Sequence, residues 1–375
     1  MQNPEEELIT ILKQSGIDFT ASLPCEKIKI LLELVSAEFF HLPLTREEEG
    51  VGIAAGAALA GKRPAMFIQS SGIGNMINAL LSLTGFYALP LAIFVSQRGI
   101  YQEKIAAQFP MGKGLPKILK GAGIRYTLIS SAEDFRVIPR KLRSVYEKNQ
   151  IHAFLLSPAI WEGSSARSHA MFDQRPVVCM IPETRRDAAS PDCTRYELIE
   201  VVAPYLENRV VVSNLGWPSK ELYALKHQPS NFYMLGSMGM ATPIGLGISL
   251  SSKKDVVVID GDGSLLMNPG VLATAAHVSP DNLTILAIDN SSYGSTGSQE
   301  TLTGSCVDLE LVARGFGIGN TKKAATQEQL KSAMTEKKSG MKFIHALALP
   351  GNRDVPNIPI DHRAIRDHVM RFLKK

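Results

Sequence analysis

The sequence feature that most constrains the fold of this chain is an apolar run that leads into an aspartate flanked by glycines. Residues 256–260 (VVVID) are followed directly by Gly261-Asp262-Gly263-Ser264. A continuous apolar run of this length predicts a strand buried on both faces of a sheet. We expect a glycine turn after it, whose backbone amides can meet a phosphate, and then a helix from about Leu265. The segment therefore predicts a parallel α/β sheet with an anion site at one edge.

A second polar segment follows the next predicted strand, at residues 283–289. It reads Asp289-Asn290-Ser291-Ser292-Tyr293, and Asn290 lies 28 residues after Asp262. That spacing leaves room for one helix and one return strand, so both side chains should emerge at the same carboxyl edge of the sheet. Two oxygen ligands and a diphosphate suit octahedral Mg²⁺. A Gly-Asp-Gly alone is weak evidence, because many turns carry it, but the strand, the helix and Asn290 together make a specific pattern.

Helices and short apolar strands alternate in both halves of the chain. Its 375 residues are too many for one ordinary core and suit two α/β domains. In the first half we expect helices at 6–14, at 28–39 and from about 75, and strands at 19–22, 65–69, 91–95 and 152–157. In the second half we expect a helix at 196–206 and strands at 209–213, 255–260, 283–289 and 341–347. We therefore predict two doubly wound parallel-sheet domains, residues 1–168 and 192–375, with a linker at 169–191 that is marked by prolines and charges.

No charged side chain lies between Arg63 and Arg98, a stretch long enough to cross a bilayer. Polar residues interrupt it, among them Gln69, Asn75 and Asn78, and they would be costly in lipid. We therefore expect a buried strand, a glycine turn, a helix and a second strand. So uncharged a helix also suits an interface between domains or subunits.

Charge and cysteine usage exclude several classes of partner and site. Lys and Arg number 40 against 36 Asp and Glu, and no basic block indicates a nucleic-acid or membrane partner. The four cysteines, which form no CxxC pair, are Cys25, Cys179, Cys193 and Cys306. The N-terminus is acidic where an export signal would be basic, so we expect a reduced, cytoplasmic protein.

The Gly-Asp-Gly motif, its spacer and Asn290 resemble the motif of the thiamine-diphosphate-dependent, pyruvate-decarboxylase-like enzymes. The resemblance implies thiamine diphosphate and Mg²⁺ as cofactors, a pyrimidine-binding first domain, a diphosphate-binding second domain and no middle domain. It also implies that Asp262, Asn290 and the carbonyl of Ser292 hold Mg²⁺. The family usually shows two asparagines where this chain has Asp289-Asn290, and only the second matches the ligand position.

Residues 235–240 (LGSMGM) are similar to the family segment that bends the cofactor. Met238 is then the bulky wedge, and the Gly236 carbonyl accepts a hydrogen bond from the aminopyrimidine. The alternative interpretation is a plain glycine-rich turn. By resemblance the cofactor-binding residues are Glu47, Gly216, Gly236, Ser237, Met238, Gly261, Asp262, Gly263, Ser264, Asn290, Ser292 and Tyr293.

A third match is the segment Arg46-Glu47-Glu48-Glu49-Gly50, which opens a run of small residues that includes Gly56. The family has one glutamate at a fixed distance before such a glycine, and counting back from Gly56 selects Glu47. Its implied catalytic role is to protonate the pyrimidine ring, which allows the thiazolium carbon to lose its proton and attack the substrate. For Glu48 and Glu49 we expect only the common role of acidic residues at the positive start of a helix. In the family this glutamate and the diphosphate site come from different subunits, which implies a homodimer at minimum, or a dimer of dimers, with active sites at the subunit interface.

Segments along nearly the whole chain resemble sulfopyruvate and phosphonopyruvate decarboxylases: residues 23–25, 45–52, 68–75 and 107–113. Residues 293–297 (YGSTG) and Met240 resemble the sulfopyruvate branch, whose two domains are often separate α and β chains. The chain thus resembles their fusion. The implied reaction converts sulfopyruvate to sulfoacetaldehyde, a coenzyme M precursor, and CO₂. The alternatives are decarboxylation of phosphonopyruvate to phosphonoacetaldehyde, a 2-oxo acid carboligase, and a non-catalytic cofactor-binding protein, which would lack the glutamate.

Either substrate is a small 2-oxo acid with a second strong anion, and it requires cationic groups in the pocket. The candidates are Arg98, directly after a predicted buried strand, and Lys113, with Gln69 as a further polar residue. Lys113 could equally be an ordinary surface residue. We expect Arg98→Ala to raise KM for sulfopyruvate.

Overall fold

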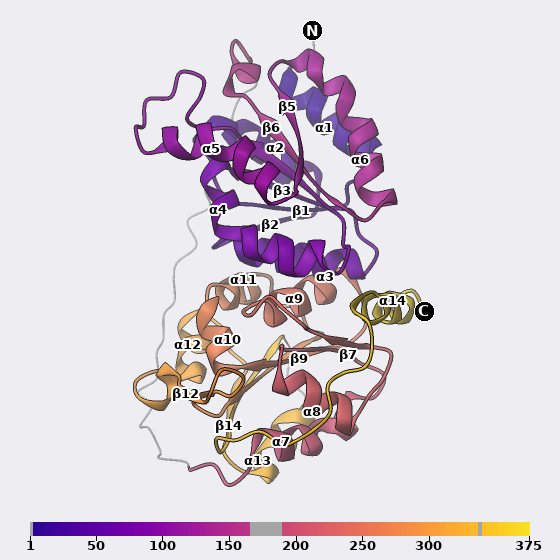
Figure 1. Ribbon diagram of the computed structural model, residues 1–375, viewed down its shortest axis with the longest axis vertical. Coiled ribbons are helices and arrows are strands. Elements are labelled where there is room, and N and C mark those ends of the chain that lie inside the picture. Colours follow the sequence, from indigo (N-terminus) through magenta and orange to yellow (C-terminus); the bar gives the residue numbers. More distant parts are fainter. Residues whose placement is uncertain (1–2, 166–189, 337–339) are drawn as a thin grey trace. The chain divides into compact units, whose positions relative to one another are not determined.

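The computed structural model describes residues 3–165, 190–336 and 340–375. The chain divides into two compact units, Met1–Arg175 and Pro176–Lys375 (Figure 1). Residues 169–189 of the predicted linker lie outside the described residues, and so does Cys179. Cys25 and Cys193 are buried, and Cys306 is exposed.

The first unit is a six-stranded parallel sheet in the order β2-β1-β3-β4-β6-β5. Phe67, Phe94 and Phe154 lie side by side on β3, β4 and β6, with ring centroids 5.0 and 4.8 Å apart. This stacked row forms the centre of the core on one face of the sheet. The strands are β1 (Phe19–Ser22), β2 (His41–Pro43), β3 (Pro64–Gln69), β4 (Leu91–Ser96), β5 (Arg125–Ile129) and β6 (Ile151–Leu156). The helices are α1 (Pro4–Gln14), α2 (Lys29–Glu38), α3 (Glu47–Leu59), α4 (Ser70–Ala79), α5 (Gln108–Gly121) and α6 (Ile138–Glu147).

The second unit is also a six-stranded parallel sheet, in the order β13-β14-β10-β9-β7-β8, with a small antiparallel pair, β11 and β12, beside it. The valines and isoleucine of β9 are buried, as expected for a strand covered on both faces. The strands are β7 (Val210–Ser213), β8 (Asn231–Tyr233), β9 (Val256–Gly261), β10 (Leu283–Asp289), β11 (Ser292–Tyr293), β12 (Gln299–Glu300), β13 (Thr321–Ala324) and β14 (Lys342–Leu347). The helices are α7 (Arg195–Val202), α8 (Trp217–Leu225), α9 (Ala241–Ser251), α10 (Asp262–Met267), α11 (Val271–Val278), α12 (Leu309–Gly315), α13 (Gln327–Thr335) and α14 (His362–Leu373).

The predicted fold class, two doubly wound parallel sheets, is confirmed, but two helix starts were predicted wrongly. The helix α10 begins at Asp262 rather than near Leu265, and α4 begins at Ser70 rather than near Asn75. Glycines and serines in these segments predicted turns, yet here they lie inside the first helical turns. Gly72 and Gly263 have packing reasons to be there, because a Cβ on either would collide with a neighbouring side chain.

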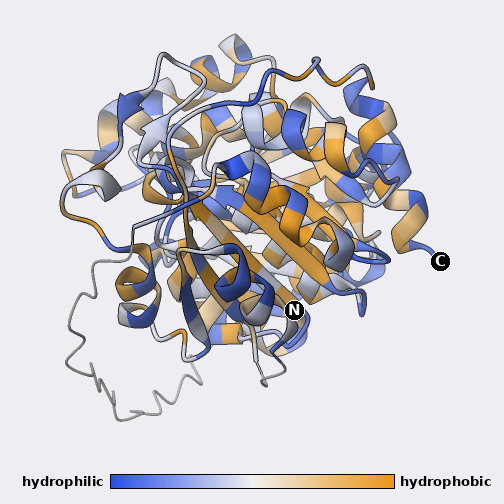
Figure 2. Cartoon of the chain, turned by 90° about the horizontal axis from the view of Figure 1, so that it is seen from below, coloured by the Kyte–Doolittle hydropathy of each residue, from blue (hydrophilic) through white to orange (hydrophobic). Residues whose placement is uncertain are grey.

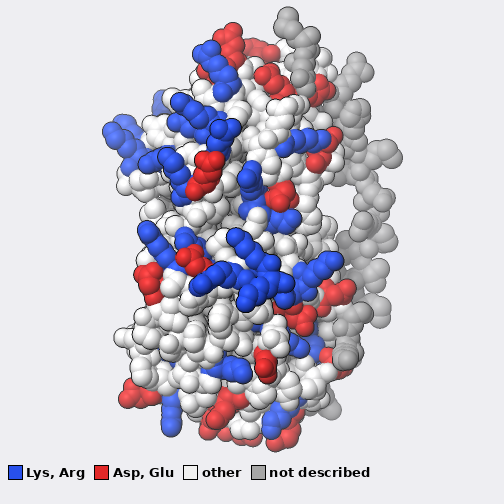
Figure 3. Space-filling model, turned by 90° about the vertical axis from the view of Figure 1, so that its right-hand side faces the viewer, with Lys and Arg blue, Asp and Glu red and all other residues white. Residues whose placement is uncertain are grey.

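The surfaces of both units are of mixed polarity. The strands appear as apolar ribbons, while the helices around them carry both apolar and polar residues (Figure 2). Basic and acidic side chains are both scattered over the face in Figure 3. Among the helices of the described residues, none combines the length and the hydrophobicity that a membrane span requires.

Candidate active site

A cavity of about 120 Å³ in the second unit gathers most of the residues that the sequence singled out there. It lies where β7, β9 and β10 end, which is the carboxyl edge at which parallel sheets bind ligands. The predicted residues that line it are Met238, Gly261, Asp262, Gly263, Ser264, Asn290, Ser292 and Tyr293. Gly216 lies between two lining residues, whereas Gly236 and Ser237 do not line the cavity.

The sequence reading missed one wall of this cavity. Asn214, Leu215, Trp217 and Pro218 line it, and they directly follow the end of β7. The edge rule that selected Asp262 and Asn290 could have found them, because β7 pairs with β9 in parallel. Gly216 has a φ of +80°, and a Cβ there would lie 2.5 Å from the Ser295 hydroxyl. This turn therefore requires glycine.

Asp262 and Asn290 both lie buried at the cavity, each 3 % exposed. Thr301 donates a hydrogen bond to Asp262 Oδ2 at 2.5 Å, and the Thr303 hydroxyl lies 3.2 Å from the same oxygen. Burial raises the pKa of Asp262, and the nearby Asp289 carboxylate raises it further. The amide nitrogen of Asn290 has no hydrogen-bond partner among the described residues. A buried amide N–H without a partner beside a buried carboxylate fits a site whose ligand supplies a hydrogen-bond acceptor.

The close oxygen–oxygen contacts around Asp262 outnumber the hydroxyl protons that could bridge them. The hydroxyls of Thr301 and Thr303 make four oxygen contacts: with Asp262 at 2.5 and 3.2 Å, with Asp289 at 2.7 Å and with each other at 2.8 Å. Two hydroxyls supply only two protons. With both carboxylates ionised, two of the four contacts therefore lack a hydrogen. A cation on Asp262 would balance this excess, so the donor set fits a hard ion such as Mg²⁺.

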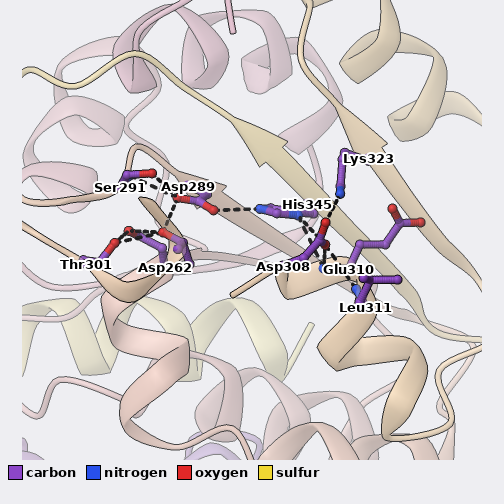
Figure 4. A network of polar contacts seen from close by, with 10 residues as sticks. Asp262, Asp289, Ser291, Thr301, Asp308, Glu310, Leu311, Lys323 and His345 are labelled. Atoms are coloured by element: carbon purple, nitrogen blue, oxygen red, sulfur yellow. Dashed lines mark hydrogen bonds and ion pairs between the residues drawn. The ribbon is translucent and has the colours of Figure 1, made fainter. Parts of the chain in front are cut away.

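His345 contacts the Asp289 carboxylate at the oxygen that Thr303 does not contact. Its Nε2 lies 2.8 Å from Asp289 Oδ2, and its Nδ1 lies 3.5 Å from Asp308, which is ion-paired with Lys323 (Figure 4). Burial alone would lower the pKa of His345, but its contacts with the two aspartates raise it above the usual value. Burial likewise disfavours ionised Asp289, yet the hydrogen bonds from His345 and Thr303 bring its pKa below the usual value.

Tyr293 and Met238 shape two sides of the cavity. The Tyr293 ring packs so closely on Gly263 that a Cβ there would lie 2.3 Å from a ring carbon. Met238 is half-buried in a tight bend, where Ser237 and Gly239 have φ values of +58° and +88°. The bend is thus a glycine-containing turn that places Met238 at the cavity, and the role of Met238 as a wedge for the cofactor stays a prediction.

A buried ion pair supports the wall formed by α7 and α8. Arg195, which lines the cavity, forms two hydrogen bonds to Glu221, at 2.8 and 3.0 Å, and a third to Asn352. Asn352 in turn donates to the carbonyl of Gly294, next to Tyr293. No local sequence pattern joins these three segments, and the sequence reading did not include them.

Glu221→Gln is expected to lower the free energy of unfolding by about 3–5 kcal/mol, because it leaves Arg195 charged, buried and without a counter-charge. Urea unfolding at neutral pH measures this. The matched control is Glu310→Gln, since its partner Arg314 is 36 % exposed, and this i,i+4 pair should contribute at most about 1 kcal/mol. Equal, small effects of the two substitutions would contradict the prediction.

In the first unit, Glu47 is buried at the start of α3 and only 3 % exposed. Asn75 donates a hydrogen bond to its Oε2 at 3.0 Å. Gly72 makes room for it, because a Cβ at Gly72 would lie 2.6 Å from Glu47 Oε1. Glu48 is partly exposed beside Arg46, and Glu49 is fully buried and accepts a hydrogen bond from the Thr45 amide at 2.6 Å.

The three predicted substrate residues have different environments. Gln69 and Arg98 lie at the carboxyl ends of neighbouring strands, β3 and β4, whereas Lys113 is exposed on α5 over the Phe109 ring. Arg98 is 4 % exposed, and Glu103 holds its guanidinium with two hydrogen bonds, at 2.6 and 2.9 Å. That pairing brings the pKa of Glu103 down to about 2. Arg98 therefore already has a buried counter-charge, which the sequence reading did not foresee.

Two protein-family models and several known relatives match this chain. Residues 3–120 match the model "Thiamine pyrophosphate enzyme, N-terminal TPP binding domain", and residues 216–346 match its C-terminal counterpart. The chain is 46 % identical to a sulfopyruvate decarboxylase of Methanosarcina acetivorans over 96 % of this chain and 94 % of the relative. It is 32 % identical to a phosphonopyruvate decarboxylase of Streptomyces viridochromogenes, over 93 % and 89 %.

Two further comparisons concern chain organisation and fold. The sulfopyruvate decarboxylase of Methanococcus maripaludis has separate subunits: alpha is 36 % identical over 43 % of this chain, and beta is 44 % identical over 49 %. The matches cover 98 % of alpha and 100 % of beta. A thiamin diphosphate-dependent enzyme of Mycobacterium smegmatis, described as putative, superposes with a TM-score of 0.69 at 14 % identity, over 93 % of this chain and 100 % of that one.

Proposed function

This chain belongs to the thiamine pyrophosphate enzymes, in the family that includes sulfopyruvate and phosphonopyruvate decarboxylases, and we propose that it decarboxylates sulfopyruvate to sulfoacetaldehyde and CO₂. The observation that carries the proposal is the similarity to the M. acetivorans enzyme along nearly the whole of both chains. The similarity to the phosphonopyruvate enzyme is lower, so that reaction is the second candidate.

In this proposal the second unit binds the cofactor through Mg²⁺. Asp262, Asn290 and the carbonyl of Ser292 would hold the ion, and backbone amides of residues 261–264 would bind the diphosphate. Met238, which lines the same cavity, would contact the cofactor. Bound thiamine diphosphate supplies the electron sink that decarboxylation of a 2-oxo acid requires. The donor set at Asp262 supports this assignment, since it is oxygen-rich and short of protons.

Glu47 is the proposed acid–base residue. Asn75 occupies its Oε2, so the proton that it exchanges with the pyrimidine ring would be held at Oε1. The burial of Glu47 keeps bulk water from competing for that proton. Gly72 is required for this placement because of the close approach of the carboxylate.

Turnover of sulfopyruvate, phosphonopyruvate and pyruvate, compared side by side with thiamine diphosphate and Mg²⁺, tests the reaction. We expect the highest kcat/KM for sulfopyruvate, by about 10-fold or more, with free sulfoacetaldehyde as product. A preference for phosphonopyruvate would select the second candidate. Consumption of substrate without free aldehyde would indicate a carboligase and defeat the proposal.

We propose that the chain is a fusion of two subunits that forms a homodimer, or a dimer of dimers, with Glu47 and the Mg²⁺ site of each active site contributed by different copies. Mixing Glu47→Gln and Asp262→Asn proteins after reversible dissociation tests this. Random re-association would give about a quarter of wild-type activity, because half of the dimers are mixed and each has one intact site. If both residues of a site came from one chain, no activity would return.

Arg98→Ala is expected to raise KM for sulfopyruvate, as the sequence predicts, and also to destabilise the first unit by leaving Glu103 buried without its partner. The double variant Arg98→Ala/Glu103→Ala removes both charges and should recover most of the lost stability. A KM that stays high in the double variant supports a substrate role for Arg98. A KM that recovers together with the melting temperature would leave Arg98 only its structural pairing.

A further inference from the structure

Asp289 is a buried carboxylate beside the proposed metal ligands, and the proposed function gives it no role. It is 4 % exposed and precedes Asn290 directly. Its Oδ2 lies 2.8 Å from His345 Nε2. Its Oδ1 accepts hydrogen bonds from the Ser291 amide at 3.0 Å and from the Thr303 hydroxyl at 2.7 Å. Both oxygens are therefore occupied by other parts of the chain.

Thr303 lies between Asp289 and the proposed ligand Asp262. It belongs to a single turn, Leu302–Gly304, none of whose residues is buried, and Leu302 is 62 % exposed. Apolar packing does not fix this turn; the Thr301 amide donates to the Ser291 carbonyl at 3.0 Å, and the hydroxyl contacts of Thr301 and Thr303 tie the turn to the two aspartates. The Thr301 hydroxyl donates to Oδ2 of Asp262, and the Thr303 hydroxyl, whose proton goes to Asp289, lies 2.8 Å from Thr301 and 3.2 Å from the same Asp262 oxygen.

His345 supplies a rigid support for the same network. It pairs in register with Ala287 on the neighbouring strand β10, which places its side chain on the same face as Asp289, two residues further on. Asp308, which caps α12 and is ion-paired with Lys323, holds the other side of the imidazole (Figure 4). Groups from several elements thus fix the ring.

We propose that Thr303 and His345 are positioning residues of the metal site. His345 fixes Asp289, and Asp289 holds Thr303 in place. Thr303 in turn supports Thr301, 2.8 Å away, whose hydroxyl donates to Oδ2 of Asp262, so that Oδ1 is the oxygen left for Mg²⁺. The inference rests on the proposed function, because it takes Asp262 as a ligand. Outer partners that orient metal ligands typically change metal affinity by about 10–100-fold when they are removed.

Tryptophan fluorescence gives a readout that is independent of turnover. The chain has two tryptophans: Trp217 lines the cavity, and Trp161 lies in the first unit. In a Trp161→Phe background, quenching of Trp217 by thiamine diphosphate at increasing Mg²⁺ reports the apparent Kd for Mg²⁺. The indole nitrogen of Trp161 has no hydrogen-bond partner among the described residues, so this exchange removes no hydrogen bond seen there.

The matched pair at Thr303 tests the inference directly. Thr303→Val keeps the shape and removes the hydroxyl, and it should weaken Mg²⁺ binding about 10–100-fold. Thr303→Ser keeps the hydroxyl and should remain within about 3-fold of wild type. Because Thr303 is only partly buried, both variants should fold, which the melting temperature without Mg²⁺ verifies.

The matched pair at His345 provides the second arm. His345→Gln can still donate to Asp289 and should rescue much of the Mg²⁺ affinity that His345→Leu loses. At saturating Mg²⁺ all variants should bind thiamine diphosphate with the wild-type Kd, an outcome that general damage to the fold would not produce. Wild-type Mg²⁺ affinity in both Thr303→Val and His345→Leu would overturn the inference. Absence of any Mg²⁺-dependent quenching in the Trp161→Phe protein itself would instead overturn the proposed function.

Discussion

Glu47→Gln is expected to lower kcat by about 10²–10⁴-fold, which is the usual contribution of a positioned acid–base group. Glutamine has nearly the same shape, and its side-chain oxygen can still accept the hydrogen bond from Asn75, so the fold around α3 should persist. What is lost is the ability to exchange a proton. Steady-state kinetics with sulfopyruvate measures the loss, and cofactor titration followed by Trp217 fluorescence should give an almost unchanged Kd.

The matched control is the next glutamate along the same helical turn. Glu48 is partly exposed and lies 3.6 Å from Arg46, a pair that contributes little in water. Glu48→Gln should therefore leave kcat within about 2-fold of wild type. Equal losses in Glu47→Gln and Glu48→Gln, or no loss in either, would remove Glu47 from the proton transfer.

The four central strands of each sheet, and the position of the site at their carboxyl edge, could be predicted because they rest on patterns short enough to read in the sequence. The edge strands β2, β5, β8 and β13 were not predicted. The buried run of β9 and the spacing from Asp262 to Asn290 needed only strand period and parallel topology. Helix starts at Ser70 and Asp262 could not be read in this way. Local preference assigns glycine and serine to turns, and close packing against Glu47 and Tyr293 overrides that preference.

The polar network of the site could not be predicted from the sequence, because its members come from distant segments. Thr301 reaches Asp262 across 39 residues, and His345 reaches Asp289 across 56. No spacing rule selects one threonine or histidine among many at such separations. The Arg98–Glu103 pair is a different case: five residues separate its members, but only the turn between β4 and α5 brings them together.

Asp262→Asn is expected to weaken Mg²⁺ binding by at least about 100-fold, or about 2.7 kcal/mol, because it removes the only negative charge among the three proposed ligands. The loss should not come from unfolding. Burial raises the pKa of Asp262 in the folded protein, so at neutral pH its ionisation opposes folding. A neutral asparagine removes that cost, and the metal-free variant should melt at or above the wild-type temperature. Activity at about 1 mM Mg²⁺ should fall with the bound fraction of the ion.

The control for this substitution is Asp255→Asn, just before the other end of the same strand, β9. Asp255 is 61 % exposed and lies 3.7 Å from Arg209, far along the strand from the cavity. Its exchange should change neither the Mg²⁺ affinity nor the melting temperature appreciably. Fluorescence titration of Mg²⁺ with thiamine diphosphate present compares the two variants. If Asp262→Asn bound Mg²⁺ like wild type, the ion would have to be held by other oxygens of the cavity, and the carboxylate would be left as a buried partner of Thr301 alone.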